Sequence, residues 1–293
     1  MFKKIVLGLI AILGLALTFG SAGAFESTAN FGGDSNEGGT VTLSYVEWDT
    51  EVASTHVIAE VLKDEGFNVN VIPLDNAVMW QAVANGEADG MVGAWLPLTH
   101  GEQFDEYGDQ MEDLGKNLEG AITGLVVPTY MEDVNSIEDL TDEAGKKITG
   151  IEPGAGVMNA TEKALEEYPN LSDWSLESSS SGAMATALGQ AIDNKDEIVV
   201  TGWSPHWKFQ KYDLKYLDDP KGIFGDGEEI HTMVREGLKE DNPRAYQILD
   251  QFEWDLEDME SVMVDIHDGK DPQQAARDWV DNNQDKVEAW VAE

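Results

Sequence analysis

Three tryptophans occupy positions that could hold a cation. Trp48, Trp95 and Trp203 each fall where a strand is expected to end, and loop-forming residues follow each of them, so we expect them to face a cleft. The face of an indole ring attracts a cation by about 0.5 to 2 kcal/mol. A trimethylammonium group cannot donate a conventional hydrogen bond, and a cage of aromatic rings is a natural way to bind it. The three residues therefore predict a site for a quaternary ammonium group.

A second set of residues could hold an anion. The turn Pro-Gly-Ala-Gly at 153–156 precedes a helix that is predicted to begin at Val157. Free backbone N–H groups in this turn and the positive end of the helix dipole would attract an anion. The turn lacks the longer phosphate-binding patterns, so a small carboxylate is the expected guest. His100 follows Trp95 closely and could donate a hydrogen bond to that carboxylate, although an isolated histidine is more often a surface or capping residue.

Catalysis has little support in the sequence. Neither G-x-S-x-G nor H-E-x-x-H occurs, and there is no cysteine to act as a nucleophile. The five histidines are scattered without the spacing of metal ligands. Acidic pairs are so frequent that choosing one as a glycosidase pair would be arbitrary. We predict a protein that is not an enzyme and has no catalytic residues, cofactor or metal.

Two α/β half-motifs are expected to position these residues. The first comprises a strand at 40–47, a helix at 51–65 ended by Gly66, a strand at 69–72, a helix at 75–85 ended by Gly86 and a strand at 90–95. The second comprises a strand at 147–151, a helix at 157–168, a strand at 174–177, a helix at 182–194 and a strand at 198–201. The order of elements is the same in both. The spacing repeats too, since Trp48 precedes Trp95 by 47 residues and Gly156 precedes Trp203 by 47.

This repeated order predicts an α/β protein with two lobes and a ligand cleft between them, because ligands bind beyond the carboxyl ends of strands in open α/β sheets. Residues 40–125 with 219–293 are expected to form lobe one, and 126–218 to form lobe two, with extended crossovers at 124–129 and 215–219. Helices at 243–252, 256–267 and 272–290, the last capped by Asp271, are expected to cover lobe one. The tryptophans predicted to lie in the core are Trp80, Trp174, Trp254, Trp279 and Trp290.

The N-terminus predicts export. Lys3 and Lys4 precede an apolar stretch at 5–19 and a run of small residues at 21–24, which together indicate a signal peptide over 1–24. An uncleaved anchor is the alternative. Residues 25–39 are predicted to be a flexible leader. Because the chain has no cysteine for lipid attachment, we expect a free periplasmic or extracellular protein.

The charge balance is strongly acidic, with 57 Asp and Glu against 18 Lys and Arg and a formal net charge of −39. Such a chain does not favour nucleic acid, whose phosphates need a basic surface. Because the acids are spread through every segment, a solvated surface adapted to high salt is favoured over electrostatic attraction of a cationic ligand. At 1 M salt the screening length falls to about 3 Å, which removes most self-repulsion.

Four blocks of sequence are similar to those of a known family. YVEWD at 45–49, AWLPLTH at 94–100, EPGAG at 152–156 and TGWSPHW at 201–207 resemble the glycine betaine/proline betaine substrate-binding proteins of ABC importers. The resemblance covers about 40–293 and implies a periplasmic-binding-protein-like (type II) fold that closes around its ligand. In that family three tryptophans hold the quaternary ammonium, while backbone amides and a histidine hold the carboxylate.

Carried over to this sequence, the resemblance places the tryptophan prism on Trp48, Trp95 and Trp203. The carboxylate then falls on the amides of Gly156 and Val157 and on His100. The implied partners are glycine betaine and the membrane permease of an ABC importer, with the binding protein as a monomer that serves osmoprotection. Some members have their lobes in the opposite order, which leaves the lobe boundaries open. Others are anchored through an N-terminal cysteine that this chain lacks.

Three alternatives stay open at this point. The ligand could be choline, carnitine, proline betaine or dimethylsulfoniopropionate; choline has no carboxylate and would leave the anion site idle. The protein could instead be an extracellular lectin or hydrolase whose tryptophans stack on sugars, which predicts an extended line of aromatic residues. A sensory protein that reports betaine to a receptor would have the same binding residues as a transport protein.

Overall fold

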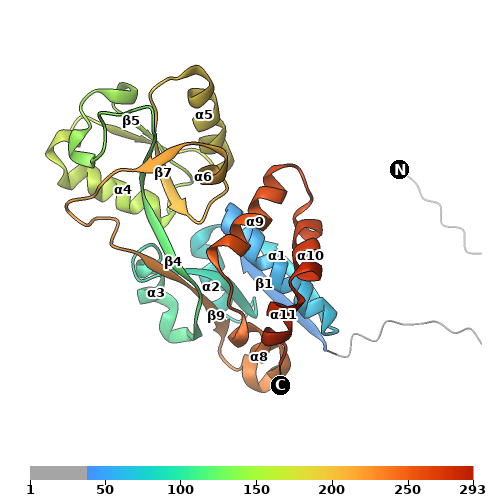
Figure 1. Ribbon diagram of the computed structural model, residues 1–293. Helices are drawn as coiled ribbons and strands as arrows, with labels where there is room; N and C mark the ends of the chain where they lie inside the picture. The colour runs from blue at the N-terminus through green and yellow to red at the C-terminus, as the bar shows by residue number, and fades with distance from the viewer. Residues whose placement is uncertain (1–37, 293) are drawn as a thin grey trace, which may run out of the picture. The chain divides into compact units, whose positions relative to one another are not determined.

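The computed structural model describes residues 38–292. The predicted signal peptide and most of the predicted leader lie outside the described residues. The chain forms a mixed α/β structure with two lobes (Figure 1).

The first lobe combines the N-terminal half-motif with the C-terminal part of the chain. Its elements are β1 (Thr40–Tyr45), α1 (Asp49–Asp64), β2 (Asn68–Pro73), α2 (Asn76–Ala84), β3 (Gly90–Leu96), α3 (Gly101–Tyr107), β9 (Glu228–Arg235), α7 (Leu238–Asp241), α8 (Pro243–Gln251), α9 (Leu256–His267), α10 (Pro272–Asn282) and α11 (Gln284–Trp290). Gly66 and Gly86, which follow α1 and α2, have φ angles of 88° and 71°. Both act as the left-handed residues that end helices, as predicted.

The second lobe is built from the middle of the chain. Its elements are β5 (Lys147–Thr149), α4 (Gly156–Glu167), β6 (Ser175–Glu177), α5 (Ser181–Asn194), β7 (Val199–Ser204), α6 (Lys208–Lys211) and β8 (Leu214–Tyr216). Short 3-10 turns lie at Gly108–Gln110, Ile137–Asp139, Glu143–Gly145 and Pro169–Leu171.

One long strand, β4 (Met111–Pro128), belongs to both lobes. Its first part pairs with β9, and from Ile122 onward it pairs with β7 and β8, all antiparallel. The strand order is β2-β1-β3-β9-β4-β7-β5-β6, with β8 also paired to β4. The predicted half-motifs supply the parallel pairs, β1 with β2 and β3 in one lobe and β5 with β6 and β7 in the other.

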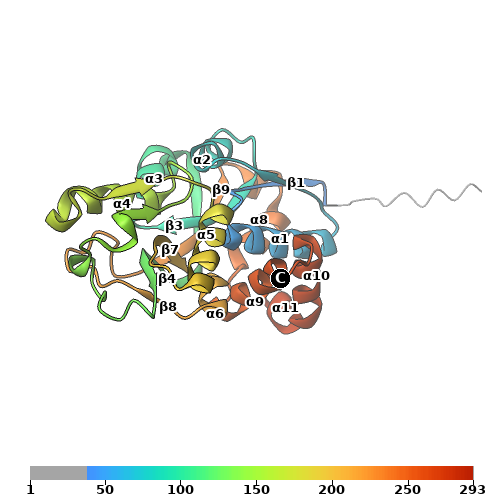
Figure 2. The ribbon, with the colours of Figure 1, turned by 90° about the horizontal axis from the view of Figure 1, so that it is seen from above.

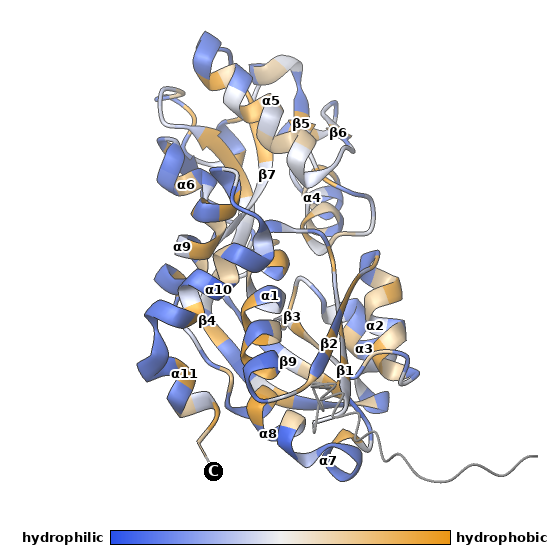
Figure 3. Ribbon diagram, turned by 90° about the vertical axis from the view of Figure 1, so that its right-hand side faces the viewer, coloured by the Kyte–Doolittle hydropathy of each residue, from blue (hydrophilic) through white to orange (hydrophobic). Residues whose placement is uncertain are grey.

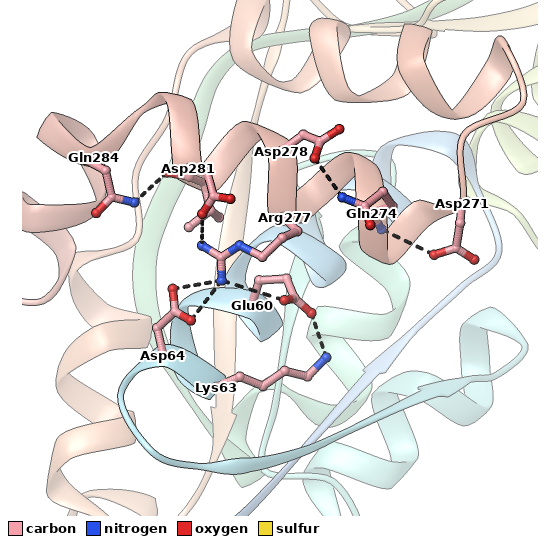
Figure 4. Close-up of polar contacts among 10 residues, drawn as sticks. Glu60, Lys63, Asp64, Asp271, Gln274, Arg277, Asp278, Asp281 and Gln284 are labelled. Carbon is pink, nitrogen blue, oxygen red and sulfur yellow. Dashed lines mark hydrogen bonds and ion pairs between the residues drawn. The ribbon is translucent and has the colours of Figure 1, made fainter.

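The C-terminal helices α8, α9 and α10 pack on α1 (Figure 2). On this face Arg277 of α10 places Nη1 2.8 Å from both carboxylate oxygens of Asp64 on α1 and Nη2 2.8 Å from Asp281 (Figure 4). Lys63 pairs with Glu60 at 2.6 Å beside them. Because these charges are partly exposed, each pair contributes at most about 1 kcal/mol. Buried apolar contacts therefore hold the helices to the lobe.

The five tryptophans predicted to be core residues are all buried. Three of them, Trp254, Trp279 and Trp290, pack with Phe252 in one aromatic cluster under the C-terminal helices. In Figure 3 the hydrophobic residues follow buried elements such as β7, while the surface helix α7 is hydrophilic. The acidic surface thus encloses an ordinary apolar core.

Several elements differ from the sequence expectation. The predicted helix 272–290 is two helices, because the chain breaks at Asn283 between α10 and α11. The strands β4 and β9 were not predicted, and the expected crossover 124–129 is the end of β4. The expected crossover 215–219 begins in β8 and continues as a loop toward β9. Asp271 caps α10 as predicted, accepting from the N–H groups of Gln273 and Gln274.

Candidate functional site

One small cavity gathers the residues that the sequence singled out. Its volume is about 30 Å³, against about 10 to 15 Å³ that one ordered water needs. Both lobes contribute to its wall. The six predicted residues on that wall are Trp48, Trp95, His100, Gly156, Val157 and Trp203. The cavity is therefore larger than a single ordered water requires.

The three tryptophans reach the cavity from three different elements. Trp48 is the residue before α1, Trp95 is the next-to-last residue of β3, and Trp203 is the next-to-last residue of β7. Their exposed fractions are 7%, 3% and 5%. All three rings are thus shielded from water, where a cation–π contact is strongest.

Hydrogen bonds at the ring edges fix two of the indoles. Trp48 Nε1 donates to Glu152 Oε2 at 3.3 Å, and Trp95 Nε1 donates to Glu51 Oε1 at 2.7 Å. These bonds engage the N–H at the edge of each ring and not its π faces. The third ring, Trp203, has the ammonium of the buried Lys208 4.3 Å from its centroid. Lys208 is not among the described residues that line the cavity, and its burial lowers the pKa to about 7.

His100 lies on the cavity wall and has one ring nitrogen without a hydrogen-bond partner among the described residues. The backbone N–H of Trp95 donates to His100 Nδ1 at 3.0 Å, which assigns the ring proton to Nε2. Among the described residues Nε2 has no hydrogen-bond partner, although the side chain is completely buried. Burial lowers the pKa of His100 to about 3, so the ring is neutral at ordinary pH. A buried N–H without a partner is costly, and an acceptor in the cavity would satisfy it.

The ring of His100 also supports the cage. It stacks on Trp48 with centroids 5.8 Å apart and an interplanar angle of 18°, and it meets Trp80 edge-on at 5.8 Å. Trp80 is a core residue of α2. The donor and one cage wall are therefore positioned by the same packing.

The turn before α4 brings Gly156 and Val157 to the cavity wall. Gly154 has a φ of 84°, and the helix begins at Gly156. The N–H groups of Gly156 and Val157 fall in the first turn, where a helix offers no internal acceptor. The two lobes also approach each other closely at Gly156, because a Cβ placed on it would lie 1.9 Å from the carbonyl oxygen of Thr99. Only glycine fits there in this closed arrangement.

Sequence reasoning missed one buried acid in the cavity. Glu51 of α1 lines the wall, is 2% exposed and holds Trp95 by the hydrogen bond described above. Its other oxygen accepts from the Thr50 hydroxyl at 2.5 Å. The abundance of acids in this chain hid it. Its place one turn after Trp48, in the first turn of a helix that starts at the cleft, is the signal that could have identified it.

A second set of contacts that sequence reasoning missed joins the lobes beside the cavity. Asp49 of α1 accepts a hydrogen bond from Trp207 Nε1 at 2.8 Å and lies 3.4 Å from His206 Nε2. Trp207 also stacks on His267 of α9, with centroids 3.5 Å apart. Burial would raise the pKa of Asp49. The hydrogen bonds of His206 and Trp207, together with the charge of Lys208, outweigh that effect and lower the pKa to about 2. The two lobes are thus bound to each other around the cavity.

Fold and cavity together define a two-lobed small-molecule-binding protein of the kind that closes by a hinge around its ligand. The chain belongs to the family of substrate-binding domains of ABC-type glycine betaine transport systems, whose model matches residues 39–282. This agrees with the resemblance carried by the four sequence blocks.

Individual relatives agree with this assignment. The structure is similar to lactococcal OpuAC in its closed, glycine betaine-bound form, with a TM-score of 0.84 and 58% identity over 86% of this chain and 99% of that one. It is also similar to ProX, the glycine/betaine/L-proline-binding protein of Borrelia burgdorferi, with a TM-score of 0.83 and 35% identity over 87% and 97% of the two chains. An ABC-transporter choline-binding protein in complex with choline matches with a TM-score of 0.81 and 28% identity over 87% and 92%.

A curated relative is GbuC, the glycine betaine/carnitine transport binding protein of Listeria monocytogenes serotype 1/2a (strain 10403S). It is 51% identical over 165 residues, 56% of this chain, and the match spans 55% of the length of GbuC. The comparison with GbuC thus reaches about half of each protein.

Proposed function

We propose that this protein captures glycine betaine outside the cytoplasm and delivers it to the permease of an ABC importer, which serves osmoprotection. The observation that carries the proposal is the pairing, in one closed cavity, of three shielded indole rings with the unpaired Nε2–H of His100. Glycine betaine has a trimethylammonium group at one end and a carboxylate at the other. It matches both halves of this cavity.

Each site residue has a role in this proposal. Trp48, Trp95 and Trp203 surround the trimethylammonium group through cation–π contacts. His100 Nε2 and the amides of Gly156 and Val157 donate to the carboxylate, as charge-assisted hydrogen bonds. The position of these amides at the start of α4 adds the positive end of the helix dipole.

Capture would proceed by closure of the two lobes. Trp48, Trp95 and His100 come from the first lobe, while Gly156, Val157 and Trp203 come from the second. A ligand that touches both sets binds the closed form better than the open form and shifts the equilibrium between them. The contacts of Asp49 with His206 and Trp207 then hold the closed form that the permease would recognise.

The donor at His100 favours a zwitterion over choline. Choline carries no carboxylate, so it would leave the buried Nε2–H unsatisfied. Carnitine and proline betaine keep both charges and remain the nearest alternatives. A sugar-stacking site is less well supported, because the three rings surround one small cavity instead of forming an extended line.

The remaining attributes belong to the same proposal. We place the protein in the periplasm or the extracellular space as a binding protein, not an enzyme, exported by residues 1–24. A monomer suffices, since one chain supplies the whole cavity wall. Among residues 38–292, none of the helices has the length and apolar character that crossing a membrane requires.

Calorimetric titration of the purified protein in molar salt, first with glycine betaine and then with choline, tests the proposal. We expect saturable binding of glycine betaine and much weaker binding of choline. Binding of choline alone would retain the cage and refute the carboxylate site. Binding of neither would refute the proposed function.

A further inference from the structure

Glu51 is the acidic residue among the described residues that line the cavity. It lies in the first turn of α1, three residues after the cage residue Trp48, and it is 2% exposed. Nothing in the roles given above uses its charge. A buried carboxylate is expensive to keep, so its presence on the wall of a binding cavity needs a reason.

The surroundings hold the carboxyl group of Glu51 in place. One oxygen accepts from Trp95 Nε1 at 2.7 Å and the other from the Thr50 hydroxyl at 2.5 Å. The facing residue on β3 is Gly93, where a Cβ would lie 2.6 Å from Glu51 Cγ and 3.1 Å from Oε1. Glycine at 93 thus leaves the space that this side chain fills.

No protein cation faces Glu51 across the described cavity wall. The charged or titratable groups near it are Asp49 on the same helix, which is also negative, and the neutral His100. The buried Lys208 of the second lobe acts by its charge on Asp49 instead, and burial lowers the pKa of the adjacent His206 to about 4, so that ring is neutral. Burial raises the pKa of Glu51 to about 7, which is the behaviour of a carboxyl group without a cationic partner.

We propose that Glu51 is the counter-charge of the cavity, a specificity-determining residue that selects a cationic head group over an uncharged group of the same shape. This inference rests on the proposed function, because it concerns the head group held by the three tryptophans. An aromatic cage alone also accepts an uncharged tert-butyl group through packing. A carboxylate in the wall favours the ligand that brings a positive charge.

The proposal predicts a direction for pH. With an uncharged ligand in the cavity, Glu51 keeps its raised pKa and is largely protonated below about pH 7. A cation within about 4 to 6 Å lowers the pKa of a carboxyl group by about 1 to 3 units. The preference for the cation is therefore fully present above pH 7 and is lost as pH falls toward the lower pKa of the cation complex.

The test compares glycine betaine with 3,3-dimethylbutanoate, in which a carbon atom replaces the quaternary nitrogen. Both ligands keep the carboxylate and the three methyl groups, and both carboxylates stay ionised between about pH 6 and about pH 8. Affinities are measured by calorimetry for the wild-type protein, for Glu51→Gln and for Glu60→Gln. Glutamine keeps the oxygen that accepts from Trp95 and removes the charge. Glu60 is the matched control, a buried acid of α1 outside the described cavity wall.

In the wild-type protein and in Glu60→Gln we expect the ratio of the two affinities to favour glycine betaine and to rise about five- to tenfold from pH 6 to pH 8. In Glu51→Gln the ratio should fall by about tenfold or more at pH 8 and lose its pH dependence. If wild-type protein binds glycine betaine and the isostere equally, the inference is wrong while the proposed function stands. If it does not bind glycine betaine at all, the proposed function itself fails.

Two further outcomes would also overturn the inference. Equal losses for both ligands in Glu51→Gln would show that Glu51 only positions Trp95. Lys208 has a lowered pKa in the same range, so Lys208→Met is measured as well. A pH dependence that survives in Glu51→Gln and disappears in Lys208→Met would assign the effect to Lys208. If Glu51→Gln does not fold, the wild-type protein and Lys208→Met are compared. A pH dependence of the affinity ratio that persists in Lys208→Met supports the inference, and one that disappears there refutes it.

Discussion

At the scale of single residues, the site combines groups whose interactions with a ligand would be weaker if water reached them. The cage rings are at most 7% exposed and the donor His100 is completely buried. In such surroundings a cation–π contact reaches about 2 kcal/mol, several times its value at an exposed position. The neutral state of His100 is equally important, because it fixes a single donor on Nε2. Burial therefore sets both the strength and the direction of the contacts.

Replacing one cage wall tests the aromatic contribution. Trp95→Ala should weaken glycine betaine binding by about tenfold or more, since the lost contact is worth at least about 1.4 kcal/mol. Trp174→Phe is the control, because Trp174 is a buried residue of the second lobe outside the described cavity wall. Calorimetry gives both affinities. Unchanged binding in Trp95→Ala would mean that the cage is assigned to the wrong residues.

Removing the donor tests the carboxylate half. His100→Phe keeps a ring against Trp48 and removes Nε2–H, so glycine betaine affinity should fall by about tenfold to a hundredfold, the value of a hydrogen bond to a charged group. Choline, which lacks the carboxylate, should lose much less. Competition for a fluorescent ligand or direct calorimetry measures both. Equal losses for the two ligands would contradict the role given to His100.

At the scale of elements, the short segments that follow strands carry the site. The turn before α4 presents two amides, and the loop after β3 presents Thr99 and His100 to it. Three hydrogen bonds hold that loop, because the Glu228 carboxylate of β9 accepts from the N–H of Leu98 and from the N–H and hydroxyl of Thr99. The loop is therefore stiff where the lobes approach each other.

A methyl group at residue 156, where the two lobes meet, should block closure of the lobes. Gly156→Ala places a Cβ 1.9 Å from the Thr99 carbonyl oxygen in the closed form, while alanine suits the helix of its own lobe at least as well as glycine does. We expect glycine betaine affinity to fall by about tenfold or more with no loss of thermal stability in the ligand-free protein. Small-angle scattering should show that ligand no longer compacts this variant. A compact complex with normal affinity would refute the closure mechanism.

The sequence predicted the half-motifs well, because their elements depend on local signals. Gly66 and Gly86 end their helices, Asp271 caps α10, and the tryptophans mark the strand ends. The sequence of β4 lacks a regular alternation of apolar and polar residues, because the strand belongs to two lobes and its buried face changes along its length. Glu51 could not be found either. The role of Glu51 in the site depends on its contacts with Gly93 and Trp95 of β3, and only the folded chain brings these residues beside it.

At the scale of the whole molecule, the surface and the interior follow different requirements. The formal net charge of the chain is −39, while the buried core of the described residues is mainly aromatic and aliphatic. A high net charge of one sign destabilises the compact state by self-repulsion, and salt screens that repulsion. The composition thus points to a molecule that is most stable in salty surroundings.

Salt should therefore stabilise the ligand-free fold. We expect the thermal unfolding midpoint to rise as sodium chloride increases from about 0.1 M to about 1 M, where the screening length falls from about 10 Å to about 3 Å. Potassium chloride serves as a control for ion-specific effects, and differential scanning calorimetry measures both series. A midpoint that stays level or falls with salt would contradict this interpretation of the acidic composition.

The most direct test of the central claim is a crystal structure of the protein with glycine betaine. The account predicts the trimethylammonium group between Trp48, Trp95 and Trp203, and the carboxylate within hydrogen-bonding distance of His100 Nε2 and of the amides of Gly156 and Val157. A ligand bound in another part of the molecule, or in this cavity with its two ends exchanged, would contradict it.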